Sequence, residues 1–274
     1  MKFADLHLHT IFSDGTYTPG ELIGEVKKRE ISAISVVDHD TVEGIAPTLK
    51  EAESAGIEVL PGIELSANYH ELEVHILGYL IDFQDAGLLK DLNLLKEGRI
   101  ERIYKIIKKL EGQGINLEAQ EVFSIAQKGI VGRLHVAKAL LAKGCVASIH
   151  EAFYKYLGDG RPAYVCDFKL SPQEAIKLIK GVGGIPVLAH PYTLKNDNLI
   201  NLFVDGGLEG LEVFYPEHSA AMTEHYRDLA KKFGLIMTGG SDCHGILKSE
   251  GNAVGSVKVP YEVVEELKQI KAGR

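Results

Sequence analysis

Cysteine is scarce in this 274-residue chain, which contains three cysteines and no tryptophan. Cys145, Cys166 and Cys243 are widely spaced, so the sequence suggests neither a disulfide framework nor a C-x-x-C metal motif. No apolar run is long enough to cross a bilayer. The first residues also lack the basic stretch followed by an apolar stretch that a secretory signal requires. We therefore expect a cytoplasmic protein that does not act at membranes.

Basic residues are the minority among the charged ones. The 30 Lys and Arg residues are outnumbered by 38 Asp and Glu residues, which gives a formal net charge of −8. A broad surface for duplex DNA needs clustered cations, so this balance argues against such a partner. It does not exclude a small anionic substrate, because bound divalent ions supply positive charge locally. The sequence also lacks a G-x-S-x-G elbow and a P-loop, so no covalent nucleophile is expected.

Short apolar runs rich in β-branched residues alternate with helical patterns along most of the chain. The predicted strands are 2–9, 33–38, 58–64, 73–80, 185–190, 210–215 and 235–241. The helical patterns between them include 18–30, 41–55, 171–181 and 217–233. This alternation predicts a mostly parallel sheet with helical crossovers. Without a G-x-G-x-x-G dinucleotide motif, it favours an α/β fold of the distorted (β/α)7 TIM-like barrel type.

Two features depart from a regular barrel. Only residues 65–72 separate the third and fourth predicted strands, which is too short for a crossover helix and predicts a hairpin-like segment. Between the fourth and fifth strands, apolar residues from Leu88 to Leu110 recur at three- and four-residue spacing, as in an amphipathic helix. Further helical patterns follow up to residue 157. We expect a barrel domain of residues 1–86 and 168–274, with a helical insertion domain of residues 87–167.

Histidine and carboxylate residues gather at the ends of the predicted strands. His7 and His9 stand two residues apart, as do Asp242 and His244, and such residues on a strand face the same side. In parallel barrels the carboxyl ends of the strands form the active face. Imidazole and carboxylate groups that converge there suit Mn, Zn or Fe. The predicted metal ligands are His7, His9, Asp14, His39, Glu64, His75, His190, Asp242 and His244.

The charge of this set indicates the substrate. Three carboxylates with three divalent ions would leave a net charge of about +3, which favours a phosphorylated substrate. Arg133 opens a predicted helix of the insertion, and its guanidinium is predicted to bind a phosphate in a bidentate manner. His218 follows the sixth strand and is predicted to bind a phosphate or to protonate the leaving oxygen.

The order of these motifs resembles the PHP (polymerase and histidinol phosphatase) family of metallophosphoesterases. The matching segments are His7-Leu8-His9-Thr10, Ser13-Asp14-Gly15, Val37-Asp38-His39-Asp40-Thr41, Pro61-Gly62-Ile63-Glu64, Val74-His75-Ile76-Leu77-Gly78-Tyr79, Ala189-His190-Pro191 and Ser241-Asp242-Cys243-His244. The resemblance implies three divalent ions, with Mn favoured and Zn or Fe as alternatives. It implies three ligand sets, which are His7, His9, Glu64 and Asp242; Glu64, His75 and His190; and Asp14, His39 and His244.

Within this family the sequence is similar to stand-alone bacterial phosphoesterases. The likeness implies hydrolysis of the 3′-phosphate of nucleoside 3′,5′-bisphosphates by a metal-bridging hydroxide, with trimming of short RNA from 5′ to 3′ in the same site. Arg133 and His218 are the expected catalytic residues, and Asp14, His39 and His190 are expected to contact substrate as well. The alternatives are a histidinol-phosphate phosphatase, a non-catalytic PHP module and an amidohydrolase. The last usually carries a bridging lysine, and no lysine lies at a predicted strand end.

Overall fold

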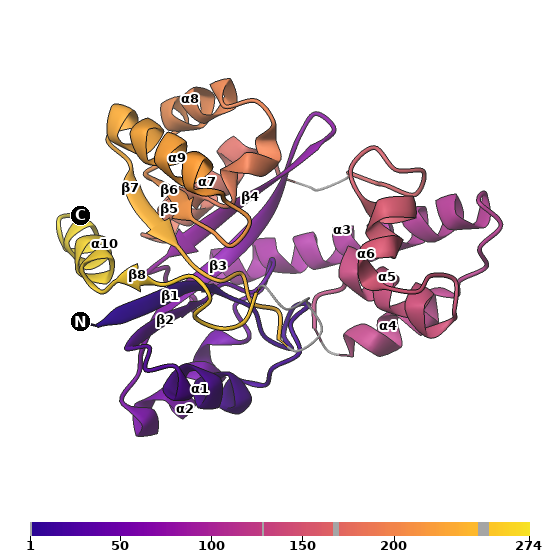
Figure 1. The fold of residues 1–274 in the computed structure, drawn as a ribbon, viewed down its shortest axis with the longest axis horizontal. Helices are drawn as coiled ribbons and strands as arrows, with labels where there is room; N and C mark the ends of the chain where they lie inside the picture. The colour runs from indigo at the N-terminus through magenta and orange to yellow at the C-terminus, as the bar shows by residue number, and fades with distance from the viewer. Residues whose placement is uncertain (1, 128, 167–169, 246–251) are drawn as a thin grey trace.

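An eight-stranded sheet forms the centre of the computed structural model, which describes residues 2–127, 129–166, 170–245 and 252–274 (Figure 1). The strand order is β7-β6-β5-β4-β3-β2-β1-β8. The strands are β1 (Phe3–Leu8), β2 (Ala33–Val36), β3 (Glu58–Tyr69), β4 (Leu72–Tyr79), β5 (Ile185–Leu188), β6 (Gly210–Phe214), β7 (Ile236–Gly239) and β8 (Val259–Pro260). The first seven correspond to the predicted strands, whereas the two-residue β8 was not predicted.

Strand direction within the sheet explains how the barrel departs from regularity. Strands β1, β2 and β3 pair in parallel, as do β5, β6 and β7, but β4 is antiparallel to both of its neighbours. Only His70 and Glu71 separate β3 from β4, so the predicted hairpin is confirmed. Beyond β7, Cys243 pairs in parallel with Leu8, and the amide of His9 donates to the Cys243 carbonyl over 3.0 Å. The sheet is therefore nearly closed, and the predicted barrel class is confirmed.

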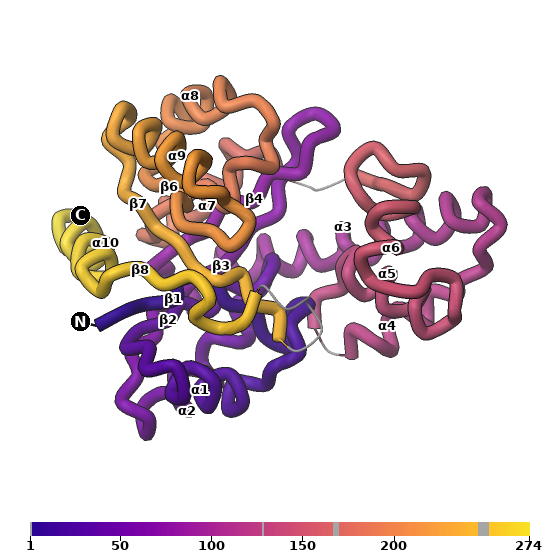
Figure 2. Tube along the Cα trace, in the orientation of Figure 1, coloured from indigo at the N-terminus to yellow at the C-terminus, as the bar shows by residue number. Residues whose placement is uncertain are grey.

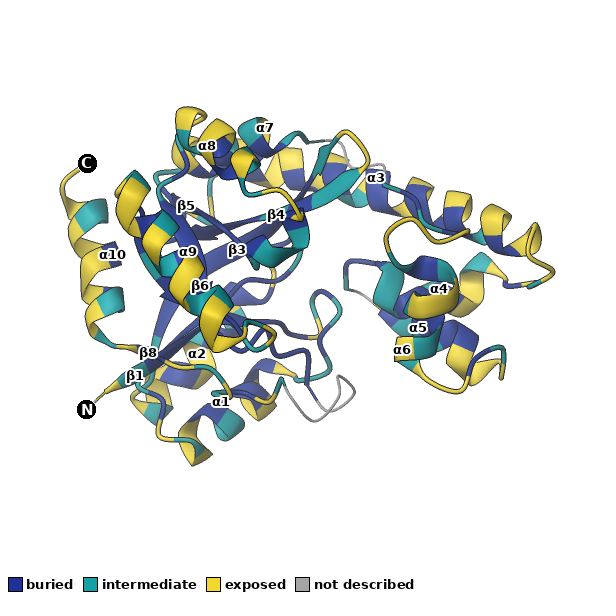
Figure 3. Cartoon of the chain, turned by 45° about the horizontal axis from the view of Figure 1, so that its top comes forward, coloured by how far each residue is buried: buried dark blue, intermediate teal, exposed yellow. Residues whose placement is uncertain are grey.

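Amphipathic helices cover the outside of the sheet and present their exposed faces to solvent (Figure 3). They are α1 (Pro19–Lys28), α2 (Ile45–Ala55), α7 (Pro172–Gly181), α8 (Asn198–Asp205), α9 (Ala220–Phe233) and α10 (Glu262–Ala272). Helix starts follow local capping chemistry: Ser219 caps α9 by accepting from the Met222 amide. The prediction that this helix begins at residue 217 is therefore wrong, because Ser219 has the extended backbone of a capping residue.

A group of helices between β4 and β5 lies to one side of the sheet (Figures 1 and 2). They are α3 (Ala86–Glu111), α4 (Ala119–Ala126), α5 (Arg133–Ala142), α6 (Ile149–Ala152) and the π-helix η1 (Phe153–Leu157). The last of the predicted helical patterns, which ends at residue 157, is thus divided between α6 and η1. A short 3₁₀ helix, η2 (Pro191–Leu194), follows β5.

Helix α3 contributes to two separate apolar cores. Near its start, Leu88 and Leu92 pack into the large cluster of the barrel. Near its end, Ile103 and Ile106 pack into a second cluster whose buried members all come from residues 103–165. On the strength of that second cluster we propose that residues 87–167 form an inserted domain. The proposed boundary between residues 167 and 168 lies outside the described residues.

Candidate metal centre

Glu64 on β3 lies at the centre of the predicted ligands. Its Oε1 is 2.8 Å from Nδ1 of His75 and 3.2 Å from Nε2 of His190. Its Oε2 lies 3.4 Å, 3.2 Å and 3.1 Å from ring nitrogens of the three histidines His7, His9 and His39, respectively. The carboxylate is 1% exposed, so these imidazoles surround it in a region from which water is largely excluded.

The other two predicted carboxylates join the same cluster. Oδ1 of Asp242 lies 3.4 Å from Nε2 of His7 and 3.2 Å from Nε2 of His9. Oδ1 of Asp14 lies 3.1 Å from Nε2 of His244. The structure therefore brings the nine side chains of the predicted set into one cluster, although they come from strands and loops far apart in the chain.

Three overlapping groups in this cluster have ligand atoms that all lie within 4.8 Å of one another. The groups are His9, Asp14, His39 and His244; His7, His9 and Asp242; and His39, Glu64 and His75. They overlap the three ligand sets implied by the family resemblance, but His9 and His39 each belong to two groups. His190 reaches the cluster through its contact with Glu64.

Backbone geometry, rather than strand alternation, aims two of these side chains. Strand β7 ends at Gly239, and Asp242 has a left-handed backbone with φ of 48°. The prediction that Asp242 and His244 converge because they share a strand face is therefore wrong, although the two residues do converge. His190 also has a positive φ, 26°. Positive φ at residues other than glycine is uncommon, and such strain is often found at functional sites.

Several buried polar atoms in the cluster lie close to groups of opposite charge but form no hydrogen bond of suitable geometry among the described residues. They are Nδ1 and Nε2 of His9, Oδ1 of Asp14 and Nδ1 of His39. A buried polar atom without a partner is costly unless something else compensates it. Imidazole nitrogens and carboxylate oxygens are the donor atoms that Mn, Zn and Fe accept in proteins. The residues present therefore fit divalent cations.

Protonation of the imidazoles supports the same conclusion. Burial disfavours the charged form of His9 and His75, yet the adjoining carboxylates raise the pKa of His9 to about 9 and that of His75 to about 10. In the metal-free protein these two imidazoles are therefore protonated at neutral pH. The cluster of carboxylates favours positive charge, which bound cations would supply in place of protons.

A second layer of side chains holds the ligands, and the sequence analysis did not single it out. Glu212 on β6 is fully buried and accepts hydrogen bonds from Nδ1 of His7 over 2.8 Å and from the His190 amide over 2.7 Å. The hydroxyl of Tyr215 donates to Oδ2 of Asp242 over 2.8 Å. The sequence could have indicated Glu212, because it is a lone carboxylate within an apolar predicted strand, and a buried carboxylate requires a partner.

Arg133 and His218, the two predicted substrate contacts, lie close to these ligands. Nη2 of Arg133 is 2.8 Å from Oε2 of Glu73, whose other oxygen is 2.9 Å from Nε2 of His75. The His218 ring lies 5.4 Å from the ring of Tyr215, which in turn donates to Asp242. Each is therefore separated from a predicted metal ligand by one intervening side chain.

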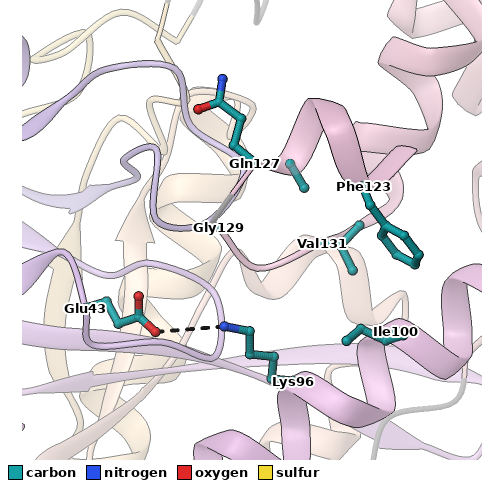
Figure 4. Close-up of a pocket in the computed structure, with 8 residues that line it drawn as sticks. Glu43, Lys96, Ile100, Phe123, Gln127, Gly129 and Val131 are labelled. Atoms are coloured by element: carbon teal, nitrogen blue, oxygen red, sulfur yellow. Dashed lines mark ion pairs between the residues drawn. The ribbon is translucent and has the colours of Figure 1, made fainter. Parts of the chain in front are cut away.

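A separate hollow of about 490 Å³ lies between α3 and the segment that joins α4 to α5 (Figure 4). Ile100, Phe123 and Val131 form part of its apolar wall, and Glu43 and Lys96 form an ion pair of 4.0 Å at its edge. None of the predicted site residues lines this hollow. It is therefore not part of the cluster around Glu64.

The arrangement agrees with a known family. A model of the PHP domain matches residues 5–245, a span that contains every member of the cluster. The chain belongs to the PHP domain family. The resemblance predicted from the ordered motifs is thereby confirmed.

Relatives with a named activity are similar to this chain over most of its length. The 3′,5′-nucleoside bisphosphate phosphatase of Chromobacterium violaceum is 33% identical over 254 residues, which cover 89% of this chain and 88% of that protein. The 5′-3′ exoribonuclease Rnm of Escherichia coli K12 is 32% identical over 247 residues, which cover 88% and 84%. A crystal structure from Bifidobacterium adolescentis, assigned as a metal-dependent phosphoesterase, is 28% identical with a TM-score of 0.88 and covers 99% of this chain and 98% of its own.

These similarities confirm the predicted class: the chain is a metal-dependent hydrolase of phosphoesters. Its cluster of histidines and carboxylates provides groups that could hold metal ions. Within the described part of the chain, no helix combines the length and the apolar character needed to cross a membrane.

Proposed function

We propose that this PHP protein removes the 3′-phosphate from nucleoside 3′,5′-bisphosphates, and that the same site trims short RNA from the 5′ end. The observation that carries the proposal is the convergence of nine nitrogen and oxygen ligand residues, Glu64 among them, with Arg133 one side chain away from His75. The activities of the Chromobacterium and Escherichia relatives support this substrate class.

The proposed centre holds three divalent ions, with Mn favoured, in the three ligand sets that the family resemblance implies. Such ions, when bound, supply positive charge to phosphate oxygens and lower the pKa of water. The protein itself contributes position. Glu64, Asp14 and Asp242 gather the cationic charge, while the buried walls exclude water and strengthen each charge interaction. A bisphosphate offers a second phosphate, and the guanidinium of Arg133 is the donor placed to bind it.

His218 is proposed to act as a hydrogen-bond acceptor for the substrate. Burial lowers the pKa of His218, which favours the neutral ring at pH 7. Its Nδ1 lies 2.9 Å from the carbonyl of Val213, so Nδ1 carries the proton and donates to that carbonyl. Its Nε2 is buried with no hydrogen-bond partner among the described residues. This nitrogen can therefore accept from a substrate hydroxyl, and it must first take up a proton before it can protonate a leaving oxygen.

A hydrolysis assay tests the proposed substrate, with release of phosphate measured for the phosphomonoesters and release of mononucleotides measured for the RNA. Protein loaded with Mn, Zn or Fe is given adenosine 3′,5′-bisphosphate, a 5′-phosphorylated RNA trinucleotide and histidinol phosphate in parallel. We expect turnover of the bisphosphate and of the trinucleotide. Turnover of histidinol phosphate alone would contradict the substrate class. Metal-loaded protein that hydrolyses none of these, nor a generic aryl phosphate, would favour a non-catalytic module.

Replacing Arg133 with alanine is expected to raise the KM for adenosine 3′,5′-bisphosphate about tenfold, matching the loss of a charge-assisted contact of about 1.4 kcal/mol. The kcat should change less, because the metal ligands are retained. The measurement is steady-state kinetics on the bisphosphate. Arg161→Ala is the matched control, since Arg161 lies exposed in the loop after η1, over the ring of Tyr154. An unchanged KM in Arg133→Ala would remove this arginine from the substrate site.

Replacing His218 with asparagine is expected to lower kcat about tenfold without loss of bound metal. The asparagine amide retains a donor near Nδ1 for the Val213 carbonyl but removes Nε2, so the change isolates the proposed acceptor. The measurement is kcat together with metal content by elemental analysis. His225→Asn, on the exposed face of α9, is the control. A kcat equal to that of the wild type would show that Nε2 takes no part.

A further inference from the structure

Glu73 on β4 connects the candidate metal centre to the helices that follow the hairpin. Its Oε1 lies 2.9 Å from Nε2 of His75. Its Oε2 lies 3.0 Å from Nη2 of Arg102 on α3 and 2.8 Å from Nη2 of Arg133 on α5. One carboxylate, 10% exposed, therefore serves a predicted metal ligand with one oxygen and two guanidinium groups with the other.

We propose that Glu73 is a positioning residue that orients His75 for metal binding and holds Arg133 beside the centre. A carboxylate only accepts hydrogen bonds when ionised, so Glu73 keeps the ring proton of His75 on Nε2. The Nδ1 of His75 then faces Glu64, 2.8 Å away, with its lone pair free to bind a cation once the second proton has left. Carboxylates that fix a ligating histidine in this way commonly determine its tautomer and raise its basicity.

The contacts of Glu73 argue against a role as a metal ligand. The Oε2 atom already accepts a hydrogen bond from Arg102 and is paired with Arg133, and the burial of the carboxylate is offset by Arg133 and Arg102, which hold its pKa well below the ordinary value. Glu73 also belongs to none of the three groups of potential ligand atoms among the described residues. Its place is behind His75, at the junction with α3 and α5.

The two arginines differ in their freedom to reach a substrate. Arg102 is 3% exposed at its side chain, and its Nε donates to the carbonyl of Val165 over 2.7 Å, which fixes it as part of the junction. Arg133 is 18% exposed and lies 5.9 Å from the ring of Phe153 and 5.2 Å from that of Tyr164. The Nη1 of Arg133 also lies 3.5 Å from Oδ1 of Asp159. Of the two guanidinium groups, that of Arg133 is the more exposed, so it is the one that can contact a phosphate.

The proposal has two consequences that a merely structural ion pair would not have. Loss of the Glu73 charge should weaken metal binding through His75, and it should weaken substrate binding through Arg133. The second consequence rests on the proposed function, because it assumes a phosphorylated substrate at Arg133. The first consequence concerns the metal alone.

Glu73→Gln tests both consequences. Metal-free protein is titrated with Mn by calorimetry, and the KM for adenosine 3′,5′-bisphosphate is then measured on the metal-loaded protein. We expect Mn affinity about tenfold weaker for at least one ion, as found when partners of ligating histidines are changed, and a KM raised several-fold. Glu71→Gln is the matched control: it makes the same charge change two residues away, at an exposed position of the same hairpin, and should alter neither quantity.

Several results would overturn the proposal. A folded Glu73→Gln protein that binds Mn as the wild type does, even with a lower Tm, would show that the ion pair is only structural. If Glu73→Gln fails to fold, Glu73→Asp keeps the charge but is too short to reach both His75 and the arginines, and an unchanged Mn affinity there would have the same meaning. Wild-type protein that binds Mn but hydrolyses no bisphosphate would contradict the proposed function alone, since the Mn titration still tests Glu73.

Discussion

Replacing Glu64 with glutamine is expected to lower kcat/KM by about 10³-fold, because several kcal/mol of charge stabilisation is lost with a central anionic ligand. Glu64 contacts the ring nitrogens of His7, His9, His39, His75 and His190, so its loss removes the shared acceptor of five imidazoles. An amide at this position is neutral and presents an N–H₂ group to side chains that require an acceptor. The measurement is steady-state kinetics, with metal content determined by elemental analysis.

The control for this change is Glu58→Gln, at the far end of the same strand. Glu58 is part of an ion pair with Lys268 at the surface, well outside the cluster, so its loss should leave the kinetics and the metal content unchanged. Circular dichroism and Tm measurements establish that both variants fold. A folded Glu64→Gln protein with full activity and full metal content would contradict the assignment of this cluster as the centre.

The barrel and the identity of the clustered residues could be predicted because they depend on local patterns. The first seven strands are short apolar runs, and each predicted run overlaps its observed strand. His9 and His39 stand just beyond such runs, so the carboxyl ends of parallel strands bring them to one face. His75 reaches this face from the first half of β4, because that strand is antiparallel and pairs His75 with Ser66, two residues past Glu64.

The remaining features depend on contacts that local patterns do not encode. The left-handed backbone at His190 and Asp242 does not follow from local preference, because both residue types more often adopt other conformations. Glu73 pairs with Arg102, which lies 29 residues further along the chain on α3. This contact depends on how the helix and the hairpin come together in the fold. The sequence does indicate that Glu73 lies near His75, since Glu73 stands two residues before His75 and therefore lies on the same face of the strand.

Removing the divalent metal with a chelator is expected to reduce hydrolysis to background, and the affinity for added Mn should rise steeply with pH. His9 and His75 are protonated in the metal-free protein, because the carboxylates around them raise their pKa values to about 9 and about 10 against the opposing effect of burial. A ligating imidazole must be deprotonated, so Mn binding releases these protons. His9 and His75 belong to different ligand sets, so the release of one proton from each predicts a gain in affinity of at least about tenfold per pH unit for each of two ions between pH 6 and 8. Calorimetry in buffers of different ionisation enthalpy counts the protons released.

The same two histidines predict opposite effects of pH on the metal-free and the metal-bound fold. Their pKa values lie above the ordinary value of 6.5, so protonation stabilises the metal-free fold. That contribution is fully present below pH 6.5 and is lost as the pH rises through about 9 and about 10. Stabilisation by Mn instead grows over this range, because binding tightens as the protons leave. The Tm of the metal-free protein should therefore fall from pH 7 to pH 10 while the increase in Tm caused by Mn becomes larger. An Mn affinity that does not change with pH would show that these imidazoles are not ligands.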